Sequence, residues 1–149
     1  QTRDPMVLKV DDTYYCYYTG HDEEADPQAA VFCRTSTDKL HWSDPVIVSA
    51  GGPEAEMSNW FGGDCECPFV VARDGLYWLF RNQRYGEDNL NTQYVSPDPL
   101  DFGVDDDRYR VGSLPVAAAE IVEHEGGYYI AALNPGLDGI RVARLDWVD

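Results

Sequence analysis

The chain has 149 residues, and 27 acidic against 11 basic side chains give it a formal net charge of −16. Nucleic acids and anionic membranes attract clusters of Lys and Arg, which this sequence lacks, so we expect neither as a partner. The length suits one hydrophobic core, and the aromatic content of 13% is typical of sheets. We therefore expect a single domain over residues 1–149.

The N-terminus shows neither an initiator Met nor a signal-peptide pattern, and no apolar run is long enough to span a membrane. These features indicate a piece of a longer or processed polypeptide. They leave the compartment undecided between cytoplasmic and secreted.

Four cysteines are too few for the disulfide framework of a small secreted domain. Cys16 and Cys33 fall in consecutive predicted strands and could face each other, while Cys65 and Cys67 flank Glu66. The Cys-x-Cys spacing differs from that of zinc sites. We expect free thiols, no metal and no cofactor.

The first structural unit opens with a hairpin whose turn is Asp11-Asp12. A loop at residues 21–27 follows the hairpin, and its charge predicts that it does not pack. The predicted strands of the unit cover residues 6–10, 14–19, 30–35 and 46–48. Four short strands of this kind match the size of one propeller blade.

A second hairpin repeats the first. Its apolar runs, Phe69 to Ala72 and Leu76 to Phe80, flank an Arg73-Asp74-Gly75 turn. Pro68 follows Pro5 by 63 residues (68 − 5), and the two hairpins match throughout at this offset. Apolar runs without alternation indicate strands buried on both faces, as happens between packed sheets.

A third copy of the hairpin follows at residues 118–131, with its turn at Gly126. The outer half of the first unit also recurs, because residues 36–42 and 96–102 share Ser, Asp, Leu and an aromatic residue at the same positions. Radial repetition of four-stranded sheets is the plan of a β-propeller. We predict an all-β partial propeller with about three four-stranded blades, at residues 3–49, 64–112 and 114–149.

The loop between the first two units carries Trp60 and Phe61. Aromatic rings in such a loop either cover a neighbouring sheet or stack on the face of a sugar, and the sequence leaves both open. Trp60 is therefore a candidate substrate-binding residue.

Inner strands of propeller blades converge on one axis, so equivalent positions face a shared central pocket. At the 63-residue offset (66 − 3), Arg3 is equivalent to Glu66, and Asp4 to Cys67. The carboxylates of Asp4 and Glu66 are then expected to meet at the axis. Glycosidic bond cleavage needs such a set, with an acid for the leaving oxygen and a second carboxylate opposite it.

Two tripeptides carry a resemblance to a known group of enzymes. Arg3-Asp4-Pro5 and Glu66-Cys67-Pro68, with the Ser-x-Asp-x-Leu-x-Trp element between them, resemble the second and third signature motifs of five-bladed propeller glycoside hydrolases. Family 32, the invertase and fructanase type, is most similar, and family 43, the arabinanase and xylosidase type, comes next. The resemblance covers the whole chain but about three of five blades.

The resemblance implies a role for each residue. Glu66 would be the general acid, Asp4 would stabilise the transition state or tune the acid, and Arg3 would bind substrate hydroxyls or orient Asp4. The first motif of these families is an Asp in an Asn-Asp-Pro context that serves as nucleophile or base, and the sequence contains no Asn-Asp-Pro. We expect it N-terminal to Gln1, so the isolated chain is expected to be incomplete as an enzyme.

Three functions stay open. The first is retaining, β-fructosidase-like hydrolysis of a carbohydrate substrate in the intact parent. The second is inverting hydrolysis of arabinans or xylosides, as in family 43, and the third is carbohydrate binding by a non-catalytic propeller module. Because a partial propeller exposes two apolar sheet faces, we also expect self-association or a partner chain that completes the ring.

Overall fold

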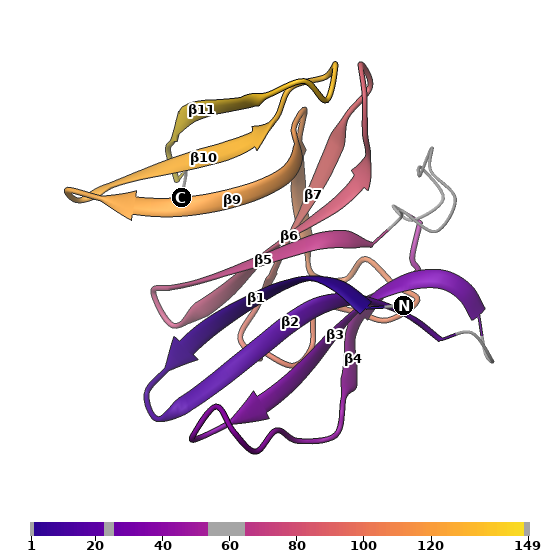
Figure 1. The fold of residues 1–149 in the computed structure, drawn as a ribbon, viewed down its shortest axis with the longest axis vertical. Coiled ribbons are helices and arrows are strands. Elements are labelled where there is room, and N and C mark those ends of the chain that lie inside the picture. Colours follow the sequence, from indigo (N-terminus) through magenta and orange to yellow (C-terminus); the bar gives the residue numbers. More distant parts are fainter. Residues whose placement is uncertain (1, 23–25, 54–64, 148–149) are drawn as a thin grey trace.

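The computed structural model describes residues 2–22, 26–53 and 65–147, and this part of the chain is built from antiparallel strands (Figure 1). The strands form three sheets that follow one another along the sequence. The predicted all-β architecture of blade-like sheets is therefore confirmed. Over the residues that the structure describes, no helix is long and apolar enough to cross a membrane.

The first sheet, blade 1, joins four strands in sequence order. They are β1 (Thr2–Val10), β2 (Thr13–Asp22), β3 (Asp26–Ser36) and β4 (Val46–Ala50). Asp11, with a φ of 50°, turns the chain between β1 and β2. The prediction of an unpacked loop at residues 21–27 is wrong at both of its ends, because backbone pairing continues as far as Asp22 opposite Asp26.

The second sheet, blade 2, has the same order of strands. They are β5 (Glu66–Arg73), β6 (Leu76–Arg84), β7 (Leu90–Ser96) and β8 (Arg110–Leu114). Asp74 and Gly75 form the turn of its first hairpin with φ values of 53° and 76°. Gly75 fits this turn because a residue without a Cβ adopts positive φ at little cost.

The third sheet, blade 3, contains three strands within the described residues. They are β9 (Ala117–His124), β10 (Gly127–Leu133) and β11 (Ile140–Leu145). Glu125 and Gly126 turn the chain between β9 and β10, with φ values of 49° and 76°. The same left-handed turn thus opens the second and third blades.

The first strands of the three blades lie next to one another. β1 contacts β5, and β5 contacts β9, while the later strands of each blade spread outward (Figure 1). This is the radial arrangement of a propeller, and it brings the starts of the inner strands together.

Each blade has two faces, and the strand registers show which positions are equivalent. We call "forward" the face that packs on the next blade in the chain, and "rear" the face that packs on the preceding blade. Equivalent forward positions in blades 1, 2 and 3 are Met6, Phe69 and Glu120; Leu8, Val71 and Val122; Tyr15, Trp78 and Tyr129; Tyr17, Phe80 and Ala131; and Thr19, Asn82 and Leu133.

Two hydrophobic cores hold the blades together. In the first interface, between blades 1 and 2, buried residues include Tyr17, Val70 and Leu79. In the second interface, between blades 2 and 3, they include Phe80 and Ile121. The apolar runs of blade 2 therefore supply both cores, since alternate residues of one strand point to opposite faces.

Two expectations about individual side chains are wrong. Cys16 pairs with Arg34 and Cys33 pairs with Tyr17, so the two cysteines point to opposite faces of blade 1 and do not face each other. Both are free thiols, as are Cys65 and Cys67. Arg81, which the sequence assigned to backbone or solvent, is fully buried in the first interface.

Candidate functional site

A bulge near the start of the inner strand recurs in all three blades. Asp4, Cys67 and Ala118 occupy equivalent positions and have φ values of 54°, 45° and 49°. The pairing register of each inner strand shifts beside these residues. Left-handed backbone in non-glycine residues is costly and is found preferentially at functional sites, where a bulge re-aims side chains.

In blades 1 and 2 this bulge brings three ionisable side chains together. The guanidinium of Arg3 donates a hydrogen bond from Nη2 to Oε1 of Glu66 in the next blade. Nε of Arg3 lies 3.7 Å from Oδ2 of Asp4. Arg3 and Asp4 are 32% and 31% exposed, and Glu66 is 8% exposed. The structure thus places both predicted carboxylates against one cation, with Glu66 the more enclosed of the two.

Asp4 is also tied to the backbone of blade 2. The hydroxyl of Thr19 donates to Oδ2 of Asp4 at 3.1 Å. The N–H of Cys67 donates to the hydroxyl oxygen of Thr19 at 3.2 Å and to Oδ2 of Asp4 at 3.4 Å. These bonds fix the distance between the two inner strands and therefore the position of Asp4 relative to Glu66.

Tyr85, immediately after β6, closes the other side of Glu66. Its hydroxyl lies 3.2 Å from Sγ of Cys67 and is hydrogen-bonded to the Glu66 side chain. Burial, followed by the neighbouring Cys67 and Glu66, raises the pKa of the Tyr85 hydroxyl above its ordinary value. Tyr85 therefore keeps its proton and can donate it in a hydrogen bond to the carboxylate.

The charges of this site are set by burial and by its neighbours. Burial lowers the pKa of Arg3, but the hydrogen bond to Glu66 and the charges of Glu66 and Asp4 raise it, and the net shift is upward. Arg3 is thus a fixed cation, and its Nη1 lies 3.1 Å from Nε2 of His21. Burial raises the pKa of the Cys67 thiol to about 12, so this thiol is neutral and is not a nucleophile at neutral pH.

The third blade has the same backbone without the chemistry. The N–H of Ala118 donates to Oδ1 of Asn82 at 3.0 Å, which repeats the link from Cys67 to Thr19. Ala117 occupies the position of Arg3 and Glu66. The ionisable groups therefore gather at the first interface.

Three of the four predicted site residues, Arg3, Asp4 and Glu66, lie together at this point. The fourth, Trp60, lies outside the described residues. Sequence reasoning missed Thr19, His21 and Tyr85. Thr19 was accessible through the repeat, since it matches Asn82 at the 63-residue offset (82 − 19), whereas a loop Tyr beyond a strand end gave no signal.

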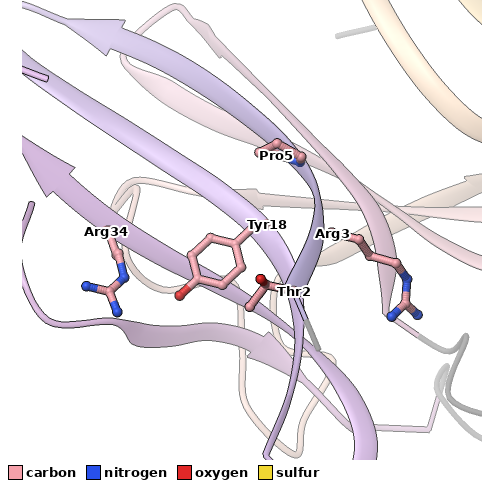
Figure 2. A pocket seen from close by; sticks show the side chains of 5 residues that line it. All are labelled: Thr2, Arg3, Pro5, Tyr18 and Arg34. Carbon is pink, nitrogen blue, oxygen red and sulfur yellow. The ribbon is translucent and has the colours of Figure 1, made fainter.

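A cavity of about 310 Å³ lies beside this site and is lined by Thr2, Arg3, Pro5, Tyr18 and Arg34. Figure 2 shows Tyr18 and Arg34 on one side of β1, while the guanidinium of Arg3 points away from them toward the carboxylates. The cavity therefore borders the rear face of blade 1 and is separate from the contact between Arg3 and Glu66.

Comparison with solved structures identifies the fold. A thermostable family-43 glycoside hydrolase superimposes with a TM-score of 0.76 and 18% identity, over 99% of this chain and 55% of that enzyme. An exo-beta-1,3-galactanase from Phanerochaete chrysosporium gives 0.70 and 17%, over 98% and 35%. An exo-1,5-alpha-L-arabinanase from a bovine ruminal metagenomic library gives 0.67 and 20%, over 97% and 50%. The chain has their fold and spans about half the length of the arabinanase and of the family-43 enzyme.

No protein-family profile and no curated protein sequence matches the chain. Among the propeller hydrolases that its motifs resemble, the structural likeness supports family 43, which the motifs ranked second. A likeness to family 32 is not shown. At identities of 17–20%, the likeness concerns the fold.

Proposed function

We propose that the chain forms part of a glycoside hydrolase of the family-43 kind, which cleaves O-glycosidic bonds with inversion at the anomeric carbon, and that Glu66 is its general acid. One observation supports this most directly: the Arg3 guanidinium contacts the carboxylates of both Glu66 and Asp4 where two inner strands meet. The fold shared with an arabinanase and a galactanase supports the reaction class. Arabinan and galactan are therefore the first substrates to test.

In this proposal Glu66 transfers a proton to the leaving glycosidic oxygen. Its enclosure supports the role, because a carboxyl group that is 8% exposed exchanges few contacts with bulk water. Tyr85 and Arg3 then donate hydrogen bonds to the carboxylate that the transfer creates. Two donors of this kind stabilise the negative charge as it forms.

Asp4 acts beside the acid rather than as the acid. Its Oδ2 accepts hydrogen bonds from Thr19 and from the Cys67 N–H, so it is held as a carboxylate on the substrate side of Arg3. A fixed negative charge there favours the positive charge that develops on the sugar ring during cleavage. Arg3 positions both carboxylates and is available to sugar hydroxyls.

The third carboxylate, which activates the attacking water, is not assigned to a residue of this chain, because the sequence lacks the Asn-Asp-Pro context. We infer that it comes from a polypeptide that completes the ring. In an inverting enzyme its carboxyl group lies about 6.5–9.5 Å from that of the acid, against about 5–5.5 Å in a retaining one.

The test compares leaving groups in the intact parent protein. Glu66→Gln should lower the rate on arabino- and galacto-oligosaccharides by about 10²–10⁴-fold. The loss should be far smaller on 2,4-dinitrophenyl glycosides, whose leaving group needs no proton. Equal losses on both substrates would remove Glu66 as the acid. The anomer first released, read by proton NMR, separates inversion from the retaining, fructosidase-like reaction.

A non-catalytic carbohydrate-binding module is the second candidate, since the chain carries two of the three expected carboxylates. Titration of the chain with arabino-oligosaccharides, followed by NMR of the Arg3 and Tyr85 side chains, tests binding without activity. Binding that persists in a complete ring with no hydrolysis would favour the module. Fructo-oligosaccharides in the same titration test the family 32 specificity.

A further inference from the structure

The rear faces of blades 1 and 2 carry equivalent side chains in different surroundings. Val70 and Leu79 on the rear face of blade 2 are 1% and 0% exposed, because they pack on blade 1. Their equivalents on blade 1 are Val7, which is 53% exposed, and Cys16, which is half-buried. Blade 1 thus presents at its surface the positions that blade 2 buries in an interface.

An arginine and a tyrosine accompany these positions on both rear faces. In blade 2 they are Arg81 on β6 and Tyr94 on β7, with the guanidinium 4.5 Å from the ring centre. In blade 1 the equivalent positions hold Tyr18 and Arg34, so the two residue types are exchanged. The pair in blade 2 is fully buried.

Blade 1 supplies the partners that bury the pair in blade 2. Nη1 of Arg81 donates to the hydroxyl of Ser49 at 2.9 Å, and Nη2 donates to the carbonyl of Gly51 at 3.3 Å. Both acceptors lie at the end of β4, the fourth strand of blade 1. The fourth strand of one blade thus covers the rear-face arginine of the next.

The pair in blade 1 lines the 310 Å³ cavity instead (Figure 2). Nη1 of Arg34 donates to the carbonyl of Ser43 at 2.8 Å, within its own blade. The cavity lies where β4 would lie if another blade preceded blade 1. It is therefore shaped to receive the fourth-strand end of a further blade.

A second feature of the interfaces recurs at the bulge. Thr19 accepts the N–H of Cys67, and Asn82 accepts the N–H of Ala118. In both cases the acceptor is on the forward face of one blade and the donor is the bulge residue of the next. Asp4 is the equivalent bulge residue of blade 1.

We propose that the rear face of blade 1 is a docking surface for a complete four-stranded antiparallel blade of a partner polypeptide. The partner places a hydroxyl or amide side chain against the N–H of Asp4. Its fourth strand ends in a hydroxyl and a carbonyl oxygen that accept from Arg34, and large apolar side chains cover Val7 and Cys16. The two interfaces within the chain define this chemistry, and the inference does not depend on the proposed hydrolysis.

A second copy of this chain does not offer that chemistry. On the forward face of blade 3, Leu133 replaces the acceptor, and Ala131 and Glu120 replace large apolar residues. Within the described residues, blade 3 has three strands and no counterpart of β4. A net charge of −16 on each copy further opposes self-association.

A tandem chain tests the proposal with a blade of known forward face. A copy of residues 2–64, carrying Cys16→Ser, is placed ahead of the whole chain, so that the natural connector between blades 1 and 2 links the added blade to blade 1. The readout is alkylation of Cys16 in the whole-chain part, measured by peptide mapping. Docking should slow this alkylation by about tenfold or more.

Two controls accompany the tandem chain. Val7→Asp in the whole-chain part should restore the alkylation rate of the unextended chain, which tolerates the change because Val7 is 53% exposed. Thr19→Val with Ser49→Ala in the added blade should restore it in part, since these changes remove the acceptors. Cys33 and Cys65, buried in the first interface, should stay slow throughout and report an intact fold.

Cys16 alkylated equally fast in the tandem and unextended chains would overturn the proposal, whether the added blade folds elsewhere or does not fold at all. Light scattering of the unextended chain gives a second decision. Self-association that Val7→Asp abolishes would show that a second copy occupies the surface, and would also overturn it.

Discussion

The two interfaces of this chain share a backbone plan and differ in chemistry. Both link a forward-face side chain, Thr19 or Asn82, to the N–H of a bulge residue in the next blade. The first interface adds Arg3 and Glu66 at the bulge and buries Arg81. Because the plan is common to both, the charged groups of the first are not needed to pack one blade on another, which favours a functional reason for their presence.

The second interface relies on aromatic packing. The ring of Trp147 lies 4.8 Å from Trp78, 5.4 Å from Tyr128 and 6.3 Å from Phe80, all in edge-to-face contact. Arg73 lies 5.3 Å from the same ring. Rings in this geometry stabilise beyond the area they bury. The second interface therefore serves as the structural reference for the first.

Neighbouring residues of β6 give the sharpest contrast. Phe80→Ala, in the second interface, should lower the free energy of unfolding by about 3–5 kcal/mol, since it leaves a cavity. Arg81→Leu, in the first interface, should cost about 1–3 kcal/mol, because Ser49 and Gly51 lose their donor. Urea titration followed by tryptophan fluorescence measures both. A larger loss for Arg81→Leu would make this arginine the main support of the fold.

The two rear faces give the next comparison. Val70→Ala should cost about 2 kcal/mol, because the side chain is 1% exposed. Val7→Ala, at the equivalent position, should stay within about 0.5 kcal/mol, since its side chain is 53% exposed. Thermal unfolding of both variants checks the difference. Equal losses would show that the unextended chain already covers the rear face of blade 1.

The bulge links should contribute less, and similarly in the two interfaces. Thr19→Val and Asn82→Leu each remove an acceptor from a bulge N–H and should each cost about 1 kcal/mol. Amide hydrogen exchange of Cys67 and Ala118 reads the two links separately. Faster exchange at both amides in either variant would mean that the interfaces open together rather than one at a time.

Alkaline pH should affect the first interface with the smallest of these effects. Burial raises the pKa of Cys33 and of Cys67 to about 12, above the ordinary 9.0. Above about pH 9 the unfolded chain loses these protons while the folded chain retains them, so the free energy of unfolding falls as the pH rises toward 12. The melting temperature should drop between pH 8 and pH 10, and it should drop less in Cys67→Ala. An identical drop would place the titrating groups elsewhere.

Much of the architecture followed from the sequence because it repeats. Matching hairpins predicted sheets in series, and the 63-residue offset placed Arg3 opposite Glu66 before any coordinates. Local patterns failed where tertiary contacts decide. The burial of Arg81 depends on Ser49 and Gly51 of another blade, and the facing of Cys16 depends on strand register.

The sequence by itself determined the strands, their turns and the pairing of an arginine with two carboxylates in one register, because hydrophobic runs and turn residues act over a few neighbours. Tertiary structure alone decided which side chains became donors to Glu66, since Tyr85 reaches it across a loop. It also decided which of two similar faces is covered, because burial is a property of neighbouring blades and not of the strand that carries the residues.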